Sequence, residues 1–146
     1  MSQLLDKYLN LRKKHVQELN DFPIKYAFSD EQLKDALKEL DADIDECTSV
    51  IGIGDVIRKK DIPDYVDMIK RQKDEIDEIT KNHDLMYEAF LYEMDNHEYA
   101  INWEGDAEVL GCFGMNERLL EEKGLLSEYR RAQSQHYKKM METGVI

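Results

Sequence analysis

The segment NHDLMYEAFLYEMDNHEYAINWEGDAEVLGCFG, residues 82–114, is the expected centre of this protein. It joins a helical apolar pattern to a high density of aromatic side chains and two of the four histidines. A helix is predicted from Asp84 to about Asp95. Advancing each residue by about 100° along that helix places Glu93 on the apolar face, opposite the other acids of the segment. A lone carboxylate on an apolar face requires a polar partner, so Glu93 is the first candidate for a site.

Apolar residues at helical spacing predict further helices on both sides of this segment. The first runs from about residue 3 to 20 and ends before Pro23, and the second follows Ser29, which forms a capping-box pattern with Gln32. A long amphipathic helix is expected from Pro63 to about residue 81. Three helical pieces complete the chain: residues 107–112, 116–123 and 125–142.

β-branched residues and two glycines interrupt the helical pattern between residues 48 and 58. This connector is expected to be a loop or a very short strand pair. The predicted fold is therefore mainly α: a compact helical bundle of about six helices, with a short glycine-containing connector and room for a minor two-stranded β element. Residues 1–146 are expected to form one domain.

The composition supports a helical, soluble protein. Hydrophobic residues make up 42% and charged residues 36%, with only 7 Gly and 2 Pro, which is too apolar for disorder and too poor in turn residues for a many-stranded β fold. Cys47 and Cys112 have no paired spacing and are expected to be free thiols. Because the N-terminus lacks a signal-peptide pattern and no apolar run could cross a bilayer, we expect a cytoplasmic protein.

The net charge of −12 is concentrated in the middle of the chain. Residues 61–115 contain four basic and fifteen acidic groups. This charge repels phosphates and anionic membranes, so direct binding to nucleic acid or a membrane is not expected, whereas a protein partner with a basic surface would be attracted. The alternative is that the carboxylates only form a solvated surface.

Glu93 and His97 are four residues apart and would share one helix face. They could act as a general acid and base or as two metal ligands. No third residue completes a metal-binding signature, so no metal and no cofactor is predicted. The alternative is a structural hydrogen bond between the two side chains.

Residues Gly52-Ile53-Gly54 precede Arg58 and Lys59, an arrangement that could bring backbone N–H groups and cations to an anion. The segment lacks the ending of a P-loop and the third glycine of a dinucleotide fingerprint. A tight structural turn followed by a solvated basic patch is the alternative.

The end of the central helix supplies the remaining candidates for binding: Asn96, His97, Glu98, Tyr99 and Trp103. Most aromatic residues of the segment are expected in the core, while Tyr99 and Trp103 have polar groups and could lie at an exposed edge. Asp106 is the expected N-cap of the short helix that follows.

Three blocks of this sequence resemble a family of small uncharacterised proteins: FPIKYAFSDEQLKDALKEL, IGIGDVIRKKDIPDYVDMIKRQKDE and DLMYEAFLYEMDNHEYAINWEGDAEVLG. Its members are encoded by bacteria, notably Firmicutes and Bacteroidetes, and by their phages and conjugative elements. The resemblance covers about residues 1–115 and implies no known reaction. Asp55 occupies a position associated with glycine in this family.

These observations favour a non-catalytic interaction protein whose acidic middle, residues 61–108, binds a basic host or element protein, by analogy with small acidic proteins of mobile elements. One alternative is a small enzyme or ligand-binding protein that uses Glu93, His97 and the loop of Arg58 and Lys59. Another is a structural subunit of a homo-oligomer, because the terminal helices are amphipathic.

Overall fold

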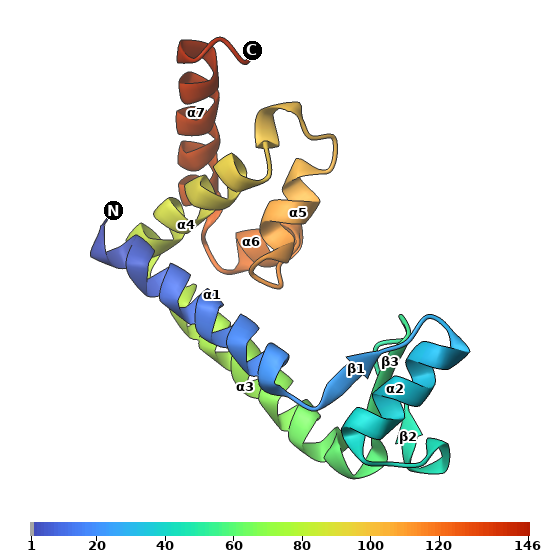
Figure 1. The fold of residues 1–146 in the computed structure, drawn as a ribbon. Coiled ribbons are helices and arrows are strands. Elements are labelled where there is room, and N and C mark those ends of the chain that lie inside the picture. The colour runs from blue at the N-terminus through green and yellow to red at the C-terminus, as the bar shows by residue number, and fades with distance from the viewer. Residues whose placement is uncertain (1) are drawn as a thin grey trace. The chain divides into compact units, whose positions relative to one another are not determined.

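The computed structural model describes residues 2–146, which contain seven α-helices and three short strands (Figure 1). The helices are α1 (Gln3–Asp21), α2 (Asp30–Leu40), α3 (Ile62–Ile79), α4 (His83–Asn96), α5 (Gly105–Gly111), α6 (Glu117–Glu122) and α7 (Leu126–Glu142). The strands are β1 (Ile24–Tyr26), β2 (Cys47–Thr48) and β3 (Asp55–Arg58). The prediction of a mainly α fold with a minor β element is confirmed, with three strands in place of two.

These elements fall into two compact units. The helical unit contains the chain up to Lys13 together with Lys73–Ile146, and the sheet unit contains Lys14–Gln72. Helices α1 and α3 each contribute residues to both units, so the single domain over residues 1–146 stays a prediction.

Helices α4 and α7 pack against each other to form the centre of the helical unit. Phe90 of α4 is fully buried and makes edge-on ring contacts with Phe113 and Tyr129, at 5.2 and 5.1 Å between centroids. Burying a side chain of this size contributes about 1.5–3 kcal/mol, and such ring pairs add about 0.5–1.5 kcal/mol each. The central position predicted for this helix is thus explained by its apolar face.

Local capping fixes where α4 begins. The Asn82 side chain accepts a hydrogen bond of 3.0 Å from the Leu85 N–H, which satisfies one of the free donors of the first turn. The expected role of Asp106 as an N-cap is wrong, because α5 begins at Gly105, two residues before the expected start at Ala107, and Glu104 occupies the cap position.

The sheet unit contains an antiparallel sheet of order β1-β3-β2. β1 pairs with β3 in the register Ile24 to Ile57, and α2 packs on these two strands. The predicted cap of α2 is confirmed: the Ser29 side chain accepts a hydrogen bond from the Gln32 N–H, and the Gln32 side chain accepts one from the Phe28 N–H.

Candidate functional site

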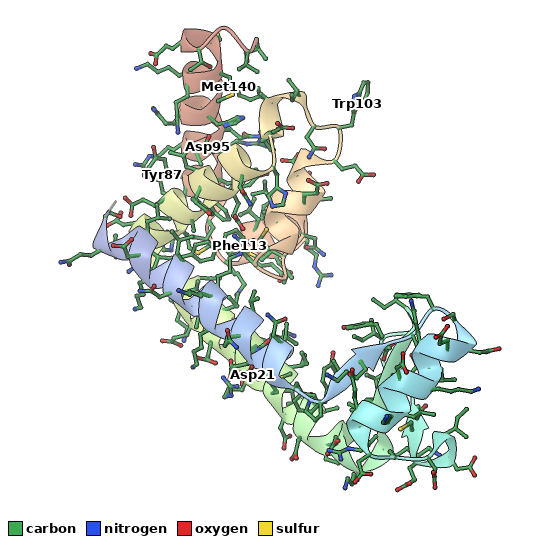
Figure 2. The ribbon with its side chains drawn as sticks, viewed as in Figure 1. Asp21, Tyr87, Asp95, Trp103, Phe113 and Met140 are labelled. Carbon is green, nitrogen blue, oxygen red and sulfur yellow. The ribbon has the colours of Figure 1, made fainter. Side chains whose placement is uncertain are left out.

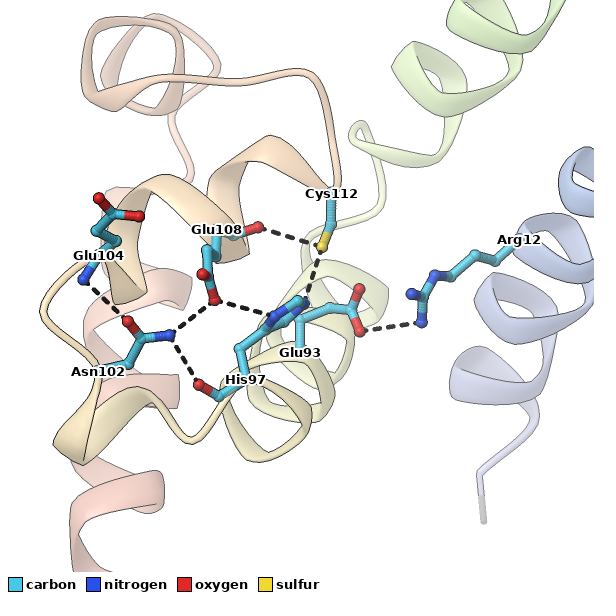
Figure 3. A network of polar contacts seen from close by, with 7 residues as sticks. All are labelled: Arg12, Glu93, His97, Asn102, Glu104, Glu108 and Cys112. Atoms are coloured by element: carbon cyan, nitrogen blue, oxygen red, sulfur yellow. Dashed lines mark hydrogen bonds and ion pairs between the residues drawn. The ribbon is translucent and has the colours of Figure 1, made fainter. Parts of the chain in front are cut away.

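Glu93 is a fully buried carboxylate with two partners from α1 (Figure 3 shows Arg12). The Tyr8 hydroxyl donates a hydrogen bond of 2.9 Å to Oε2, and the Arg12 guanidinium donates one of 3.2 Å to Oε1. Burial, together with the charge of Glu93, raises the pKa of Tyr8, so this phenol stays a donor. A buried carboxylate is tolerated when it is paired and hydrogen-bonded in this way.

His97 lies at the end of α4, on the side of Glu93 that faces α5 (Figure 3). Its Nδ1 is 3.2 Å from Oε2 of Glu108, and its Nε2 is 3.5 Å from Sγ of Cys112. In place of the hydrogen bond between Glu93 and His97 that the sequence left as an alternative, each residue bonds to other partners. The Asn102 amide donates to Glu108 Oε2 at 2.7 Å and to the His97 carbonyl at 3.0 Å, which holds the imidazole and the carboxylate in place.

Cys112 brings a thiol to the same place from the end of α5. Burial, and then the nearby Glu93 carboxylate, raise the pKa of this thiol to about 12. One side-chain ligand atom from each of Glu93, His97 and Cys112 lies within 4.8 Å of the others. Helical spacing could not indicate this third member, because Cys112 follows the end of α5, 15 residues after His97.

His136 forms a second polar cluster that the sequence did not indicate, because its helix looks polar. The ring is fully buried; Nδ1 lies 2.7 Å from Asp95 Oδ1 and Nε2 accepts a hydrogen bond of 3.1 Å from the Ala100 N–H. Lys139 completes the cluster with a 2.5 Å hydrogen bond to Asp95. With both ring nitrogens engaged, His136 has no free lone pair for chemistry and ties α7 to the end of α4.

Asp106 accepts hydrogen bonds from the hydroxyls of Tyr99 and Tyr129, and Gln133 donates to the Tyr99 hydroxyl. Tyr99, a predicted binding residue, is 7% exposed. This cluster anchors the turn after α4 to α5 and α7.

The other predicted residues near the end of α4 lie at the surface. Asn96 and Glu98 are exposed, and Glu98 has a left-handed backbone (φ 52°) that turns the chain away from the helix. Trp103 is fully exposed and points away from the ribbon (Figure 2). A tryptophan rarely leaves its whole ring in water, so this position requires an explanation.

The glycine-containing loop before β3 surrounds an anionic group, and this group is the carboxylate of the protein's own Asp55. Asp55 is buried and accepts hydrogen bonds of 2.6–3.2 Å from the Ser49 hydroxyl and the backbone N–H groups of residues 50–53. Burial would raise the pKa of Asp55, but these hydrogen bonds outweigh it and hold the pKa well below its usual range. The N–H groups expected to face a phosphate are therefore occupied.

Arg58 and Lys59 belong to the sheet unit, whereas Glu93 and His97 belong to the helical unit. The Arg58 side chain donates to Asp61 at 2.6 Å and to the Leu40 carbonyl at 3.2 Å. This supports a structural role for Arg58, while Lys59 is exposed.

Across residues 2–146, none of the helices is both long enough and apolar enough to cross a membrane. The fold and its clusters define a mainly α protein with a fully exposed tryptophan and a buried carboxylate beside a histidine and a thiol. Residues 7–136 match a family described as a family of unknown function (DUF7659), and the chain belongs to this family. Neither the comparison with curated proteins nor that with solved structures finds a match.

Proposed function

We propose that this protein is a non-catalytic interaction module that binds a basic segment of a partner protein through Trp103 and the acids around it. The observation that carries the proposal is the fully exposed Trp103 ring at the edge of an acid-lined cavity. We call this surface the Trp103 surface: Trp103, Ile101 and the cavity residues Glu104, Asp106, Ala107, Leu110, Met115, Asn116 and Glu117.

The cavity beside Trp103 measures about 500 Å³ and combines an apolar floor with an acidic rim. Leu110 and Met115 supply apolar contact, and Glu104 and Glu117 supply negative charge. Ile101, next but one to Trp103, is 57% exposed. Exposed aromatic anchors beside apolar pockets are typical of binding hot spots.

Charge selects the partner. Residues 82–117 contain nine carboxylates and no Lys or Arg, so the segment that forms the Trp103 surface has a net negative charge. A Lys or Arg from a partner could stack on the indole as a cation–π contact worth about 0.5–2 kcal/mol and reach a rim carboxylate as well. A basic, partly apolar segment of a partner would match both the negative charge and the apolar contacts of the Trp103 surface.

The test uses the fact that Trp103 is the single tryptophan of the chain. Titration with a synthetic peptide rich in Lys, Arg and Leu, at low salt, is expected to shift the indole emission. A peptide with the basic residues replaced by Glu is expected to leave it unchanged. Added salt is expected to weaken the binding, because exposed charges are screened.

Variants assign the binding to this surface by calorimetry. Trp103→Ala is expected to weaken binding of the basic peptide at least tenfold, as for a hot-spot residue. Glu104→Gln with Glu117→Gln is expected to reduce affinity and its salt dependence. Asp35→Asn with Asp45→Asn removes the same charge from exposed positions of the sheet unit and is expected to bind as the unaltered protein does.

Two outcomes would remove the proposal: no binding of the basic peptide at low salt, or equal binding by the Trp103→Ala variant. In cell extracts, immobilised protein is expected to retain a basic protein that salt releases, and the Trp103→Ala variant is expected not to retain it.

A further inference from the structure

We propose that Glu93, His97 and Cys112 form a binding site for a zinc-type divalent cation, with water in a fourth position. The three residues offer a carboxylate oxygen, an imidazole nitrogen and a thiol sulfur, the donor set that Zn²⁺ accepts in proteins. This cation site shares no residue with the Trp103 surface, and the proposal does not depend on the proposed function.

The spacing of the donor atoms fits a tetrahedral ion. With Zn–N of about 2.0–2.1 Å and Zn–S of about 2.3 Å, the nitrogen and sulfur of a tetrahedral site are about 3.5 Å apart. The measured separation of His97 Nε2 and Cys112 Sγ is 3.5 Å. A carboxylate oxygen of Glu93 lies within 4.8 Å of both, so all three donor atoms are gathered at one place.

The backbone supports this geometry. The His97 N–H bonds to the Glu93 carbonyl at 2.9 Å, the helical bond that places two of the donors on one face. Cys112 follows the last turn of α5 and its N–H bonds to the Val109 carbonyl at 3.2 Å. Donors on helical turns are held more rigidly than donors on free loops.

The residues behind His97 are those expected around a metal-bound imidazole. A carboxylate on the far ring nitrogen fixes the tautomer and leaves the other nitrogen free to bind metal. Glu108 lies 3.2 Å from Nδ1, and Asn102 holds that carboxylate. The Nε2 lone pair therefore faces Cys112 and Glu93.

Arg12 competes with the cation. Its guanidinium forms an ion pair with Glu93 Oε1, but the Arg12 side chain is 41% exposed and can turn into solvent. Cation binding replaces the thiol proton of Cys112, which passes to solvent, so the Glu93 carboxylate and the Cys112 thiolate together balance two positive charges. The position of His97, which is 27% exposed, leaves an approach from solvent.

The experiment is a titration of the reduced full chain with Co²⁺, which replaces Zn²⁺ and gives an absorption band from thiolate to metal. We expect this band in the unaltered protein and in Cys47→Ser, which removes the other free thiol. We expect its loss in Cys112→Ser. Zn²⁺ is expected to displace Co²⁺ and to raise the melting temperature of the unaltered protein but not of Cys112→Ser.

Two further variants separate coordination from a folding defect. His97→Gln is expected to weaken Co²⁺ binding at least tenfold, whereas His83→Gln, at an exposed position, is expected to leave it unchanged. Arg12→Gln is expected to tighten Co²⁺ binding about tenfold, because it removes a positive charge beside the ion. A misfolded protein would not bind more tightly.

The proposal is overturned if saturating Co²⁺ gives no thiolate band in the unaltered protein, or if the band is lost in Cys47→Ser and kept in Cys112→Ser. Equal Co²⁺ affinity in His97→Gln and the unaltered protein would also overturn it.

Discussion

Replacement of Asp55 by Asn tests whether the glycine-containing loop is built around its own carboxylate. Oδ1 accepts from Ser49, Gly52 and Ile53, and Oδ2 accepts from Val50 and Ile51. An amide keeps one oxygen and turns its NH₂ group toward the donors on the other side, so at least two hydrogen bonds are lost.

Hydrogen bonds to a charged group contribute about 1.5–3 kcal/mol each, so two of them amount to at least about 3 kcal/mol. Asp55→Asn is therefore expected to raise the opening equilibrium of this loop about 150-fold, since each 1.4 kcal/mol is a factor of ten. Hydrogen–deuterium exchange of the peptide that contains residues 50–53 measures this opening directly. Ser49→Ala removes a single donor to Asp55, worth at least about 1.5 kcal/mol, and is expected to change exchange at least about tenfold.

The same variant predicts a dependence on pH. The folded pKa of Asp55 is lowered below its unfolded value of about 3.9, so its stabilisation is fully present above about pH 4 and is lost as the pH falls further. The difference in free energy of unfolding between the unaltered protein and Asp55→Asn, from urea denaturation, is expected to shrink between pH 6 and pH 3. An exchange change below about fivefold, or a stability difference that is equal at both pH values, would refute the reasoning.

Three further predictions concern the helical unit. Tyr8→Phe removes a donor to the buried Glu93 carboxylate and is expected to lower the free energy of unfolding by about 1.5–3 kcal/mol in urea denaturation; a change below about 0.5 kcal/mol would contradict the hydrogen bond. Because the pKa of Cys112 is raised to about 12, its alkylation at pH 8 is expected to be more than about 100-fold slower in the folded protein than in the urea-unfolded chain, as followed by mass spectrometry; equal rates would exclude the raised pKa. Asn82→Ala removes the N-cap bond to Leu85 and is expected to lower the free energy of unfolding by about 1 kcal/mol in thermal unfolding. Asn82→Ser is expected to retain most of this stabilisation, because serine is also a favourable N-cap residue.

Local patterns were sufficient to predict the helices of the fold. Ser29 and Gln32 act within one helical turn, and Pro63 lies in the first turn of α3, so residues a few positions apart determine both helix starts. The glycine-containing connector was less predictable, because its strands have two to four residues and depend on pairing with β1. Strands this short carry too few residues to establish an alternating pattern.

The apolar position of Glu93 correctly indicated burial, but its partners could not be derived from spacing. Tyr8 and Arg12 are 85 and 81 residues away in the sequence, and they reach Glu93 because they are four residues apart on one face of α1. A search for charged residues on apolar helix faces would have marked Arg12 as well as Glu93, since Arg12 continues the stripe that contains Tyr8. Trp103 was expected at a core edge, and only its place in the turn between α4 and α5 explains its full exposure.

Asn102 connects the proposed cation site to the proposed binding surface. Its amide nitrogen bonds to Glu108 and to the His97 carbonyl, and its Oδ1 accepts a hydrogen bond of 2.9 Å from the Glu104 N–H. Trp103 is thus held between two anchored residues, which lowers the conformational entropy that a partner must remove on binding. A cation on His97 would restrain Glu108 and therefore Asn102. Since coupling between two sites is reciprocal, any gain in partner affinity caused by the cation must be matched by an equal gain in cation affinity caused by the partner.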